Sequence, residues 1–362
     1  MIRLACPHRL FILLLGLCLS AWSFAASARQ EVKIRKGIIG TALYTVAKPA
    51  KWDGKVLVFA HGLRPVSEPL RADLNIERSL YSTLLDDGWI IATTSYRRNG
   101  IIVEDAIRDL DLLRRHVIET DGDPKRVIVM GDSMGGVIGT LIAESAQSGF
   151  HAVLAAGAAV ASDQLGGVVS FTYEPHLPIL FLTNRSELRG PAEYAQQAAS
   201  AAVPPALWRV DRDGHVNVND QERLAAVRAL EEALDGGDLE HHRDGTIAIA
   251  ANSSARFFEN SVEGNIAGVT ENHGNIFTSL VPEDLEQLGL ATGDHFELSV
   301  GDHTVRVLLG SDYGDVAKGE WIGILRAEGV LMIARNYASA CEALQCSTGD
   351  LLTITPSQLT GD

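Results

Sequence analysis

A serine held between two glycines is the residue in this chain best suited to nucleophilic chemistry. Residues 131–135 read Gly-Asp-Ser-Met-Gly, which fits the pattern G-x-S-x-G. They directly follow a β-branched run at 126–130 and precede a helical stretch over 136–147. A serine on such a strand-to-helix turn holds its hydroxyl above the edge of the sheet. Ser133 is therefore the predicted nucleophile, and the alternative is a structural turn whose serine only caps the helix.

A serine hydroxyl needs a general base, and in hydrolases with this turn the chain order is serine, then acid, then histidine. His215 follows a strand-like segment at 207–210 and precedes a helix predicted over 220–234. This places its imidazole at the same edge of the sheet as Ser133, so we predict it as the base. The histidines that fit worse lie inside a predicted helix or before a strand: His116, His151 and His176.

The third group of such a site is a carboxylate that orients the histidine and stabilises its charged form. Glu187 is the first acidic residue after the strand predicted at 179–182. Asp163, a few residues after the strand predicted at 152–156, is the alternative acid. The sequence favours Glu187 and leaves Asp163 open.

Two backbone N–H groups are predicted to form an oxyanion hole. Met134 follows the nucleophile at the start of a helix, where an N–H group faces developing negative charge. A strand at 55–60 ends in His61-Gly62, which lets the chain turn so that the N–H of Leu63 faces the serine. We interpret His61 as a structural residue of this loop and not as a second base.

The elements that must hold these residues alternate between buried strands and amphipathic helices. Runs that are apolar on both faces predict a parallel sheet covered by helices on both sides. The fold class predicted for residues 29–235 is α/β, with a doubly wound and mostly parallel sheet. Residues 236–245 are polar and glycine-rich and are predicted as a linker. Residues 246–362 are predicted to form a smaller, mostly β, barrel-like C-terminal domain. Its strands are expected at 246–250, 295–300, 303–309 and 329–333.

The first 28 residues have the parts of a secretory signal peptide. Two arginines are followed by an apolar run at 10–19 and by Ala-Ser-Ala at 26–28. That run is about half the length that a membrane-spanning helix needs, and no later segment approaches about 20 apolar residues. The sequence predicts an exported protein, periplasmic or extracellular, without a membrane span in the mature chain.

Composition excludes several other classes of protein. Lys and Arg number 31 against 46 Asp and Glu, a formal net charge of −15 that disfavours nucleic acid as a partner. The pair His241-His242 lacks a third ligand at useful spacing, so we predict no metal there. Chemistry by a serine, a histidine and an acid needs no metal or organic cofactor, so we predict none. Export would allow Cys341 and Cys346 to form a disulfide, but a regular helix there would point them apart. The sequence leaves both states open.

Residues 37–235 resemble an α/β-hydrolase on the strength of these motifs. The resemblance implies that Ser133 is the nucleophile, Glu187 the acid and His215 the base. It is specific for the fold and reaction class and not for the substrate, which is a small-molecule or polymeric ester.

A second resemblance covers about residues 246–356. It rests on an ordered series of short motifs, from Gly-Asn-Ile-Phe-Thr at 274–278 to Cys-Ser-Thr-Gly-Asp at 346–350. This region is similar to the C-terminal β-barrel domain of S-adenosylmethionine hydroxide adenosyltransferases and halogenases. The resemblance implies the barrel fold and possible homo-oligomer formation through this domain. In that family the catalytic acidic residues come largely from an N-terminal domain that has no counterpart here.

Together these features predict an exported serine hydrolase that cleaves carboxylic esters through an acyl-enzyme on Ser133. A serine peptidase of the same fold is the first alternative. The second is a binding or assembly protein whose hydrolase domain is vestigial.

Overall fold

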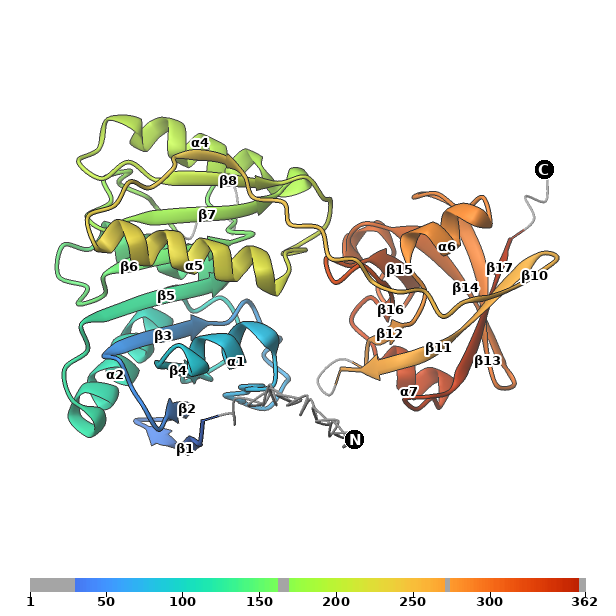
Figure 1. Ribbon diagram of the computed structural model, residues 1–362, viewed down its shortest axis with the longest axis horizontal. Coiled ribbons are helices and arrows are strands. Elements are labelled where there is room, and N and C mark those ends of the chain that lie inside the picture. The colour runs from blue at the N-terminus through green and yellow to red at the C-terminus, as the bar shows by residue number, and fades with distance from the viewer. Residues whose placement is uncertain (1–29, 162–168, 271–273, 358–362) are drawn as a thin grey trace, which may run out of the picture.

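The computed structural model describes residues 30–161, 169–270 and 274–357. It contains a helix-covered sheet of nine strands and a separate eight-stranded sheet that closes into a barrel (Figure 1). This confirms the predicted fold class of an α/β domain followed by a smaller β domain. The predicted signal peptide lies outside the described residues.

The large sheet is mostly parallel and has the strand order β1-β2-β4-β3-β5-β6-β7-β8-β9. Among the described strands of this sheet, β2 alone runs in the opposite direction, and it pairs antiparallel with both β1 and β4. Every residue of β4, β6 and β7 is buried, as expected for parallel strands covered on both faces. The strands of this sheet are β1 (Val32–Ile39), β2 (Ala42–Pro49), β3 (Lys55–Ala60), β4 (Trp89–Thr94), β5 (Arg126–Asp132), β6 (Ala152–Ala156), β7 (Ile179–Asn184), β8 (Ala206–Val210) and β9 (His242–Asp244).

Helices cover both faces of this sheet. The apolar sides of α1 and α5 pack with the strands in one core cluster, while α2, α3 and α4 pack in two clusters on the other side. The sheet is therefore doubly wound, and the turns at the carboxyl ends of its parallel strands meet along one edge. The helices are α1 (Ser79–Asp86), α2 (Val103–Asp121), α3 (Met134–Glu144), α4 (Arg189–Gln197) and α5 (Asp220–Leu234).

The C-terminal domain is a closed barrel of seven strands with one extra short strand. Its order is β10-β11-β12-β16-β15-β14-β13-β17, and β11 also pairs with β17, which closes the ring. A separate apolar core fills it. Its elements are β10 (Arg256–Phe258), β11 (Ser261–Val269), β12 (Ile276–Thr278), α6 (Pro282–Gln287), β13 (His295–Val300), β14 (His303–Gly310), β15 (Trp321–Leu325), β16 (Leu331–Arg335), α7 (Ala340–Leu344) and β17 (Leu351–Pro356).

Three local features differ from the sequence predictions. The polar segment predicted as a linker contributes β9, which pairs in parallel with β8 at the edge of the sheet. The strand predicted at 246–250 is wrong, since the chain there is extended without a strand partner. The antiparallel hairpin of β1 and β2 was not predicted, because its exposed first strand lacks a buried apolar run.

Cys341 and Cys346 form a disulfide, with their Cα atoms 5.0 Å apart. The helix that would have separated them ends at Leu344, and Gln345 takes a left-handed conformation with φ of 51°. The chain therefore turns back toward Cys341, which decides the question that the sequence left open.

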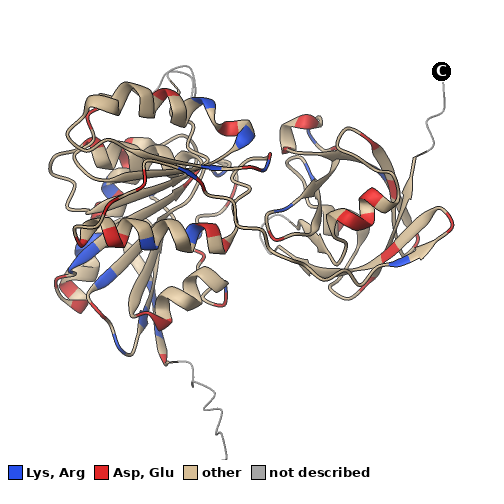
Figure 2. Cartoon of the chain, turned by 45° about the horizontal axis from the view of Figure 1, so that its top comes forward, with Lys and Arg blue, Asp and Glu red and all other residues tan. Residues whose placement is uncertain are grey.

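Acidic residues occur in both domains (Figure 2), in keeping with the net charge of −15. Within the described part of the chain, no helix is long and apolar enough to cross a membrane. The same residues include no group of three or more His, Cys, Asp or Glu that could hold a metal ion.

Candidate active site

The turn that carries Ser133 is sharp and sterically demanding. It joins the end of β5 to the start of α3, and Ser133 has φ of 55° and ψ of −118°. A side chain at Gly131 would collide with the backbone of Gly135, and one at Gly135 would collide with the carbonyl of Ala60. Both glycines of the motif are therefore required by close backbone approach, which holds the serine in a conformation that non-glycine residues rarely adopt.

The structure brings together the three side chains that the sequence singled out. The Nε2 atom of His215 lies 2.9 Å from the Oγ atom of Ser133. Its Nδ1 atom is hydrogen-bonded to Oε1 of Glu187. Ser133, Glu187 and His215 follow β5, β7 and β8 respectively, so the shared edge of the sheet places them side by side.

This geometry assigns the protons on the imidazole. A carboxylate only accepts, so Nδ1 of His215 donates to Glu187. Nε2 is then free to accept the proton of the Ser133 hydroxyl. The hydrogen bond to Glu187 raises the pKa of His215 against the opposing effect of burial, and the negative charges of Asp312 and Asp132 add to the increase.

Glu187 is fixed by contacts on both of its oxygens. Its Oε2 atom accepts a hydrogen bond of 3.0 Å from the backbone N–H of Val216. The neighbouring Ser186 exchanges two hydrogen bonds with the backbone of Gly214, of 2.9 and 3.2 Å. The acid loop and the histidine loop are thereby joined along their length, which holds the carboxylate against the imidazole.

Gly157, just after β6, is a residue of the site that sequence reasoning missed. A side chain there would lie 2.9 Å from Oε2 of Glu187 and 2.7 Å from the Val216 side chain. Its φ of 55° also favours glycine. The absence of a side chain at Gly157 leaves the space that Glu187 occupies. The signal in the sequence was a glycine directly after a predicted buried strand.

Asp132, inside the serine motif, was also not singled out. Its carboxylate forms a two-point ion pair with Arg223 of α5, at 2.5 and 3.1 Å, and the Arg223 side chain is 3% exposed. The pair ties the serine turn to the helix that follows the histidine loop. The sequence offers no signal for it, because 91 residues separate the partners.

The loop predicted to supply an oxyanion donor lies against the nucleophile. A side chain at Gly62 would lie 3.2 Å from Cβ of Ser133, a tight contact that would require a small shift of the loop or of the serine turn. Leu63 follows directly, with its side chain exposed. Met134 is the first residue of α3, where N–H groups have no acceptor in the preceding turn. The two predicted donors thus flank Ser133 from separate elements.

His61 is buried beneath this loop. Its Nδ1 atom is 2.7 Å from the carbonyl of Gly62, and its ring lies 4.0 Å from that of Tyr96, centre to centre. Burial lowers the pKa of His61 to about 4, so the ring is neutral near pH 7. These contacts fit the structural role that the sequence suggested.

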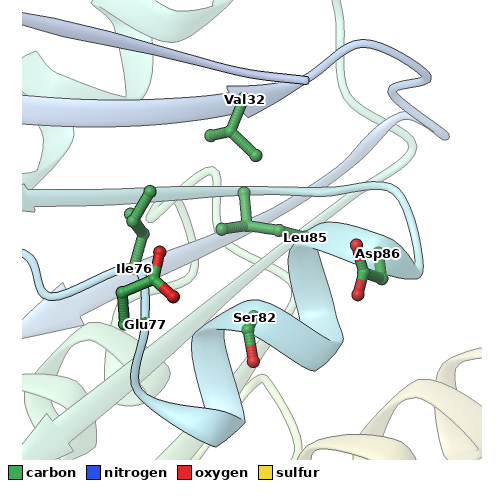
Figure 3. A pocket seen from close by; sticks show the side chains of 6 residues that line it. All are labelled: Val32, Ile76, Glu77, Ser82, Leu85 and Asp86. Carbon is green, nitrogen blue, oxygen red and sulfur yellow. The ribbon is translucent and has the colours of Figure 1, made fainter. Parts of the chain in front are cut away.

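The other predicted acid, Asp163, lies outside the described residues. Two hollows elsewhere on the domain do not include Ser133, Glu187 or His215. One is a small space of about 30 Å³ between α1 and the start of β1, lined by Val32, Ile76 and Leu85 among others (Figure 3). The other, of about 600 Å³, flanks the start of α2.

Comparison with known proteins gives separate matches for the two domains. Residues 265–353 match the family described as SAM hydroxide adenosyltransferase C-terminal domain. An uncharacterized conserved protein from Thermotoga maritima is 24% identical, with a TM-score of 0.27 over 35% of this chain and 49% of that one. The chain thus spans about half the length of that protein.

Among solved structures, an esterase of Pyrococcus furiosus is 15% identical, with a TM-score of 0.43 over 56% of this chain and 90% of that one. An α/β-hydrolase enzyme from a deep-sea metagenome library is 13% identical, with a TM-score of 0.46 over 57% of this chain and 99% of that one. No curated protein matches the sequence.

A parallel sheet with a strained serine turn, followed in the chain by an acid and a histidine, is the arrangement of α/β-hydrolases. The N-terminal region is accordingly α/β-hydrolase-like. The C-terminal region is a domain of the SAM hydroxide adenosyltransferase C-terminal type.

Proposed function

We propose that this protein is a serine hydrolase that cleaves carboxylic esters through an acyl-enzyme on Ser133. One observation carries the proposal. The chain of hydrogen bonds from Ser133 through His215 to Glu187 puts a nucleophile, a base and an orienting acid in contact. Such an arrangement is suited to acyl transfer.

In the first half of the reaction, Nε2 of His215 takes the proton of the Ser133 hydroxyl as Oγ bonds to the ester carbonyl carbon. The carbonyl oxygen becomes negatively charged and is stabilised by the N–H groups of Leu63 and Met134. The imidazolium, stabilised by Glu187, then protonates the departing alkoxide. The products of this half are the alcohol and an acyl group bonded to Ser133.

In the second half, His215 takes a proton from water, and the hydroxide oxygen bonds to the acyl carbon. The bond from that carbon to Oγ of Ser133 breaks, and His215 returns the proton to Oγ. The carboxylic acid leaves, and the enzyme is restored without any net change in its protons. The same reaction steps on an amide substrate would make the protein a peptidase. Amides react less readily, because nitrogen is the poorer leaving group.

The test is a panel of esters of graded acyl length, with matched amides, assayed on the wild-type protein and on Ser133→Ala. We expect ester cleavage that exceeds amide cleavage, and a loss of about 10⁶-fold in kcat in the variant. Circular dichroism of both proteins controls for folding. Retention of a tenth of the wild-type rate by Ser133→Ala would contradict the proposal.

A fluorophosphonate probe separates the enzyme from a binding protein with an inactive hydrolase domain. We expect the probe to label wild-type protein and not Ser133→Ala. Folded wild-type protein that is neither labelled nor active on any ester would favour the binding protein.

We further propose that the protein is exported and that cleavage follows Ala28. The composition of residues 1–28 supports this, with two arginines before a short apolar run and small residues at 26–28. N-terminal sequencing of the protein expressed in a bacterial host is expected to give Arg29 as the first residue. A cytosolic protein that keeps residues 1–28 would contradict export.

A further inference from the structure

The loop that carries His215 is held from the barrel side as well as from the sheet. Ala327 of the barrel, in the turn after β15, donates its backbone N–H to Oδ1 of Asn217 at 2.8 Å. Nδ2 of Asn217 donates to the carbonyl of Leu325 at 3.0 Å. Nδ2 of Asn219 lies 3.4 Å from the carbonyl of Ala327. The barrel therefore contacts the loop at positions two and four residues after the histidine.

The oxygen and the nitrogen of the Asn217 side chain both form hydrogen bonds. It is completely buried, and besides the two bonds to the barrel its Nδ2 donates to the carbonyl of Asp213 at 2.9 Å. Its backbone N–H and carbonyl are both bonded to the side chain of Asn184, at the end of β7. One residue thus links the barrel, the histidine loop and the strand before the acid.

The barrel also approaches the residue that precedes the histidine. Gly214 has φ of 116°, and a side chain there would lie 3.0 Å from the carbonyl oxygen of Ser311, in the turn after β14. The positive φ and this close approach of the barrel backbone both favour glycine here. Contacts from the barrel therefore bracket His215 on both sides in the sequence.

The segment between these contacts is strained. Val216 has φ of 49°, a conformation that β-branched residues rarely adopt. Its N–H nevertheless donates to Glu187, so its conformation sets the distance from the carboxylate to His215. Strained residues persist only where surrounding contacts over-determine them. Asn217, the next residue, supplies several of those contacts.

We propose that the barrel is a working part of the hydrolase site, because it positions the base His215 against Ser133 through Asn217. This inference rests on the proposed ester hydrolysis and adds to it a requirement for the docked C-terminal domain. Asn217 is a positioning residue, since it touches neither of the reacting atoms. The barrel then contributes to catalysis by holding the loop that carries the base.

The experiment breaks the contact from each side in the full-length protein. Asn217→Ala removes the side chain in the hydrolase domain, and Ala327→Pro removes the N–H that bonds to it from the barrel. We expect each change to lower kcat by about 10²-fold with little change in KM. The reason is that each change misplaces the base and leaves the residues that bind the substrate unchanged. The rate of fluorophosphonate labelling should fall in parallel.

Two further readouts separate positioning from general damage. The double variant should be no slower than the worse single variant, because both changes remove the same contact. The acid limb of the pH profile should move to lower pH, because a loosened His215 loses part of its bond to Glu187. Asn217→Asp provides a second route if Ala327→Pro does not fold, since it leaves the barrel sequence unchanged and puts a carboxylate against two carbonyl oxygens. Its readout is kcat and not the pH profile, because the added negative charge itself raises the pKa of His215.

Thr304→Ala is the matched control. It removes a 2.9 Å side-chain hydrogen bond to Ser299 at the β13–β14 hairpin, the end of β14 opposite to Ser311. We expect it to keep the wild-type kcat. Asn217 and Ala327 variants with wild-type kcat and pH profile would overturn the inference while the proposed function stands. The inference would also be overturned if the loss of kcat in these variants equalled the fraction of protein that circular dichroism shows to be unfolded. If the wild-type protein cleaves no ester, the proposed function itself fails, and the inference fails with it.

Discussion

The serine turn and the histidine loop reach the same point of the molecule by different means. The turn at Ser133 is held by close approach of backbone at Gly131 and Gly135, within the sheet and its next helix. The loop at His215 is held by side-chain hydrogen bonds that come from another strand and from another domain. The nucleophile is thus held by close packing of backbone against backbone, and the base is held by hydrogen bonds from distant parts of the chain.

This difference indicates where the site is vulnerable. A turn held by close packing of backbone depends mainly on the glycines that allow that packing. A loop held by buried hydrogen bonds loses its shape when any partner is removed, because the other polar group is left buried and unsatisfied. Changes far from the substrate should therefore affect the base more than the nucleophile.

Among changes that leave Ser133 in place, the largest effect is expected from Glu187→Gln, which alters the histidine side alone. A glutamine amide carries no negative charge. It therefore neither stabilises the imidazolium form of His215 nor holds Nδ1 as the protonated nitrogen as firmly as the carboxylate does. We expect kcat to fall by about 10⁴-fold while the protein stays folded. Steady-state kinetics with a short-chain ester measure the loss, and circular dichroism reports the fold. A variant within tenfold of wild type would mean that another acid supports His215.

Arg223→Met tests the ion pair that ties the serine turn to α5. The change leaves the Asp132 carboxylate without its buried partner, which typically costs about 3 kcal/mol in the free energy of unfolding. Chemical denaturation of the hydrolase domain measures this loss. Glu144→Gln is a comparison on the same domain, because Glu144 accepts its hydrogen bonds far along α3 from Ser133. An unchanged unfolding free energy in Arg223→Met would show that the turn needs only its glycines.

The smallest effect is expected from Asp312→Asn in the barrel turn nearest the site. The negative charge of Asp312 raises the pKa of His215, so its removal lowers that pKa. Hydrolysis needs neutral His215 and is lost as the pH falls through this pKa. The acid limb of kcat/KM should therefore move to lower pH in the variant, by less than about one unit because the site is open to solvent.

The control for this shift is structural. Oδ1 of Asp312 accepts a 2.8 Å hydrogen bond from the N–H of Gly314, and an asparagine can keep that bond. The other carboxylates facing His215 are those of Glu187 and Asp132, and neither is changed. A shift to higher pH, or none at low ionic strength, would show that the barrel does not act on the base through charge.

The sequence was sufficient for the strands and helices whose signal is local. The strands predicted at 55–60 and 152–156 and the helix at 220–234 lie within the observed bounds, because buried runs and amphipathic periodicity are properties of neighbouring residues. The hairpin of β1 and β2 and the edge strand β9 were missed, since exposed and polar segments become strands only by pairing with a sheet already formed. The disulfide was undecided for a similar reason, because one left-handed residue, Gln345, turns the chain.

By itself the sequence indicated Ser133, His215 and the strand-to-helix turn that carries the serine, and it favoured Glu187 over Asp163 as the acid. Residue types and short spacings are sufficient there, because the constraints act between neighbours. Only the tertiary structure decided that Gly157 makes room for Glu187, that Arg223 neutralises Asp132 and that the barrel bonds to Asn217. Those contacts join residues that lie far apart in the chain, and their partners are fixed only when the sheet and the barrel have packed.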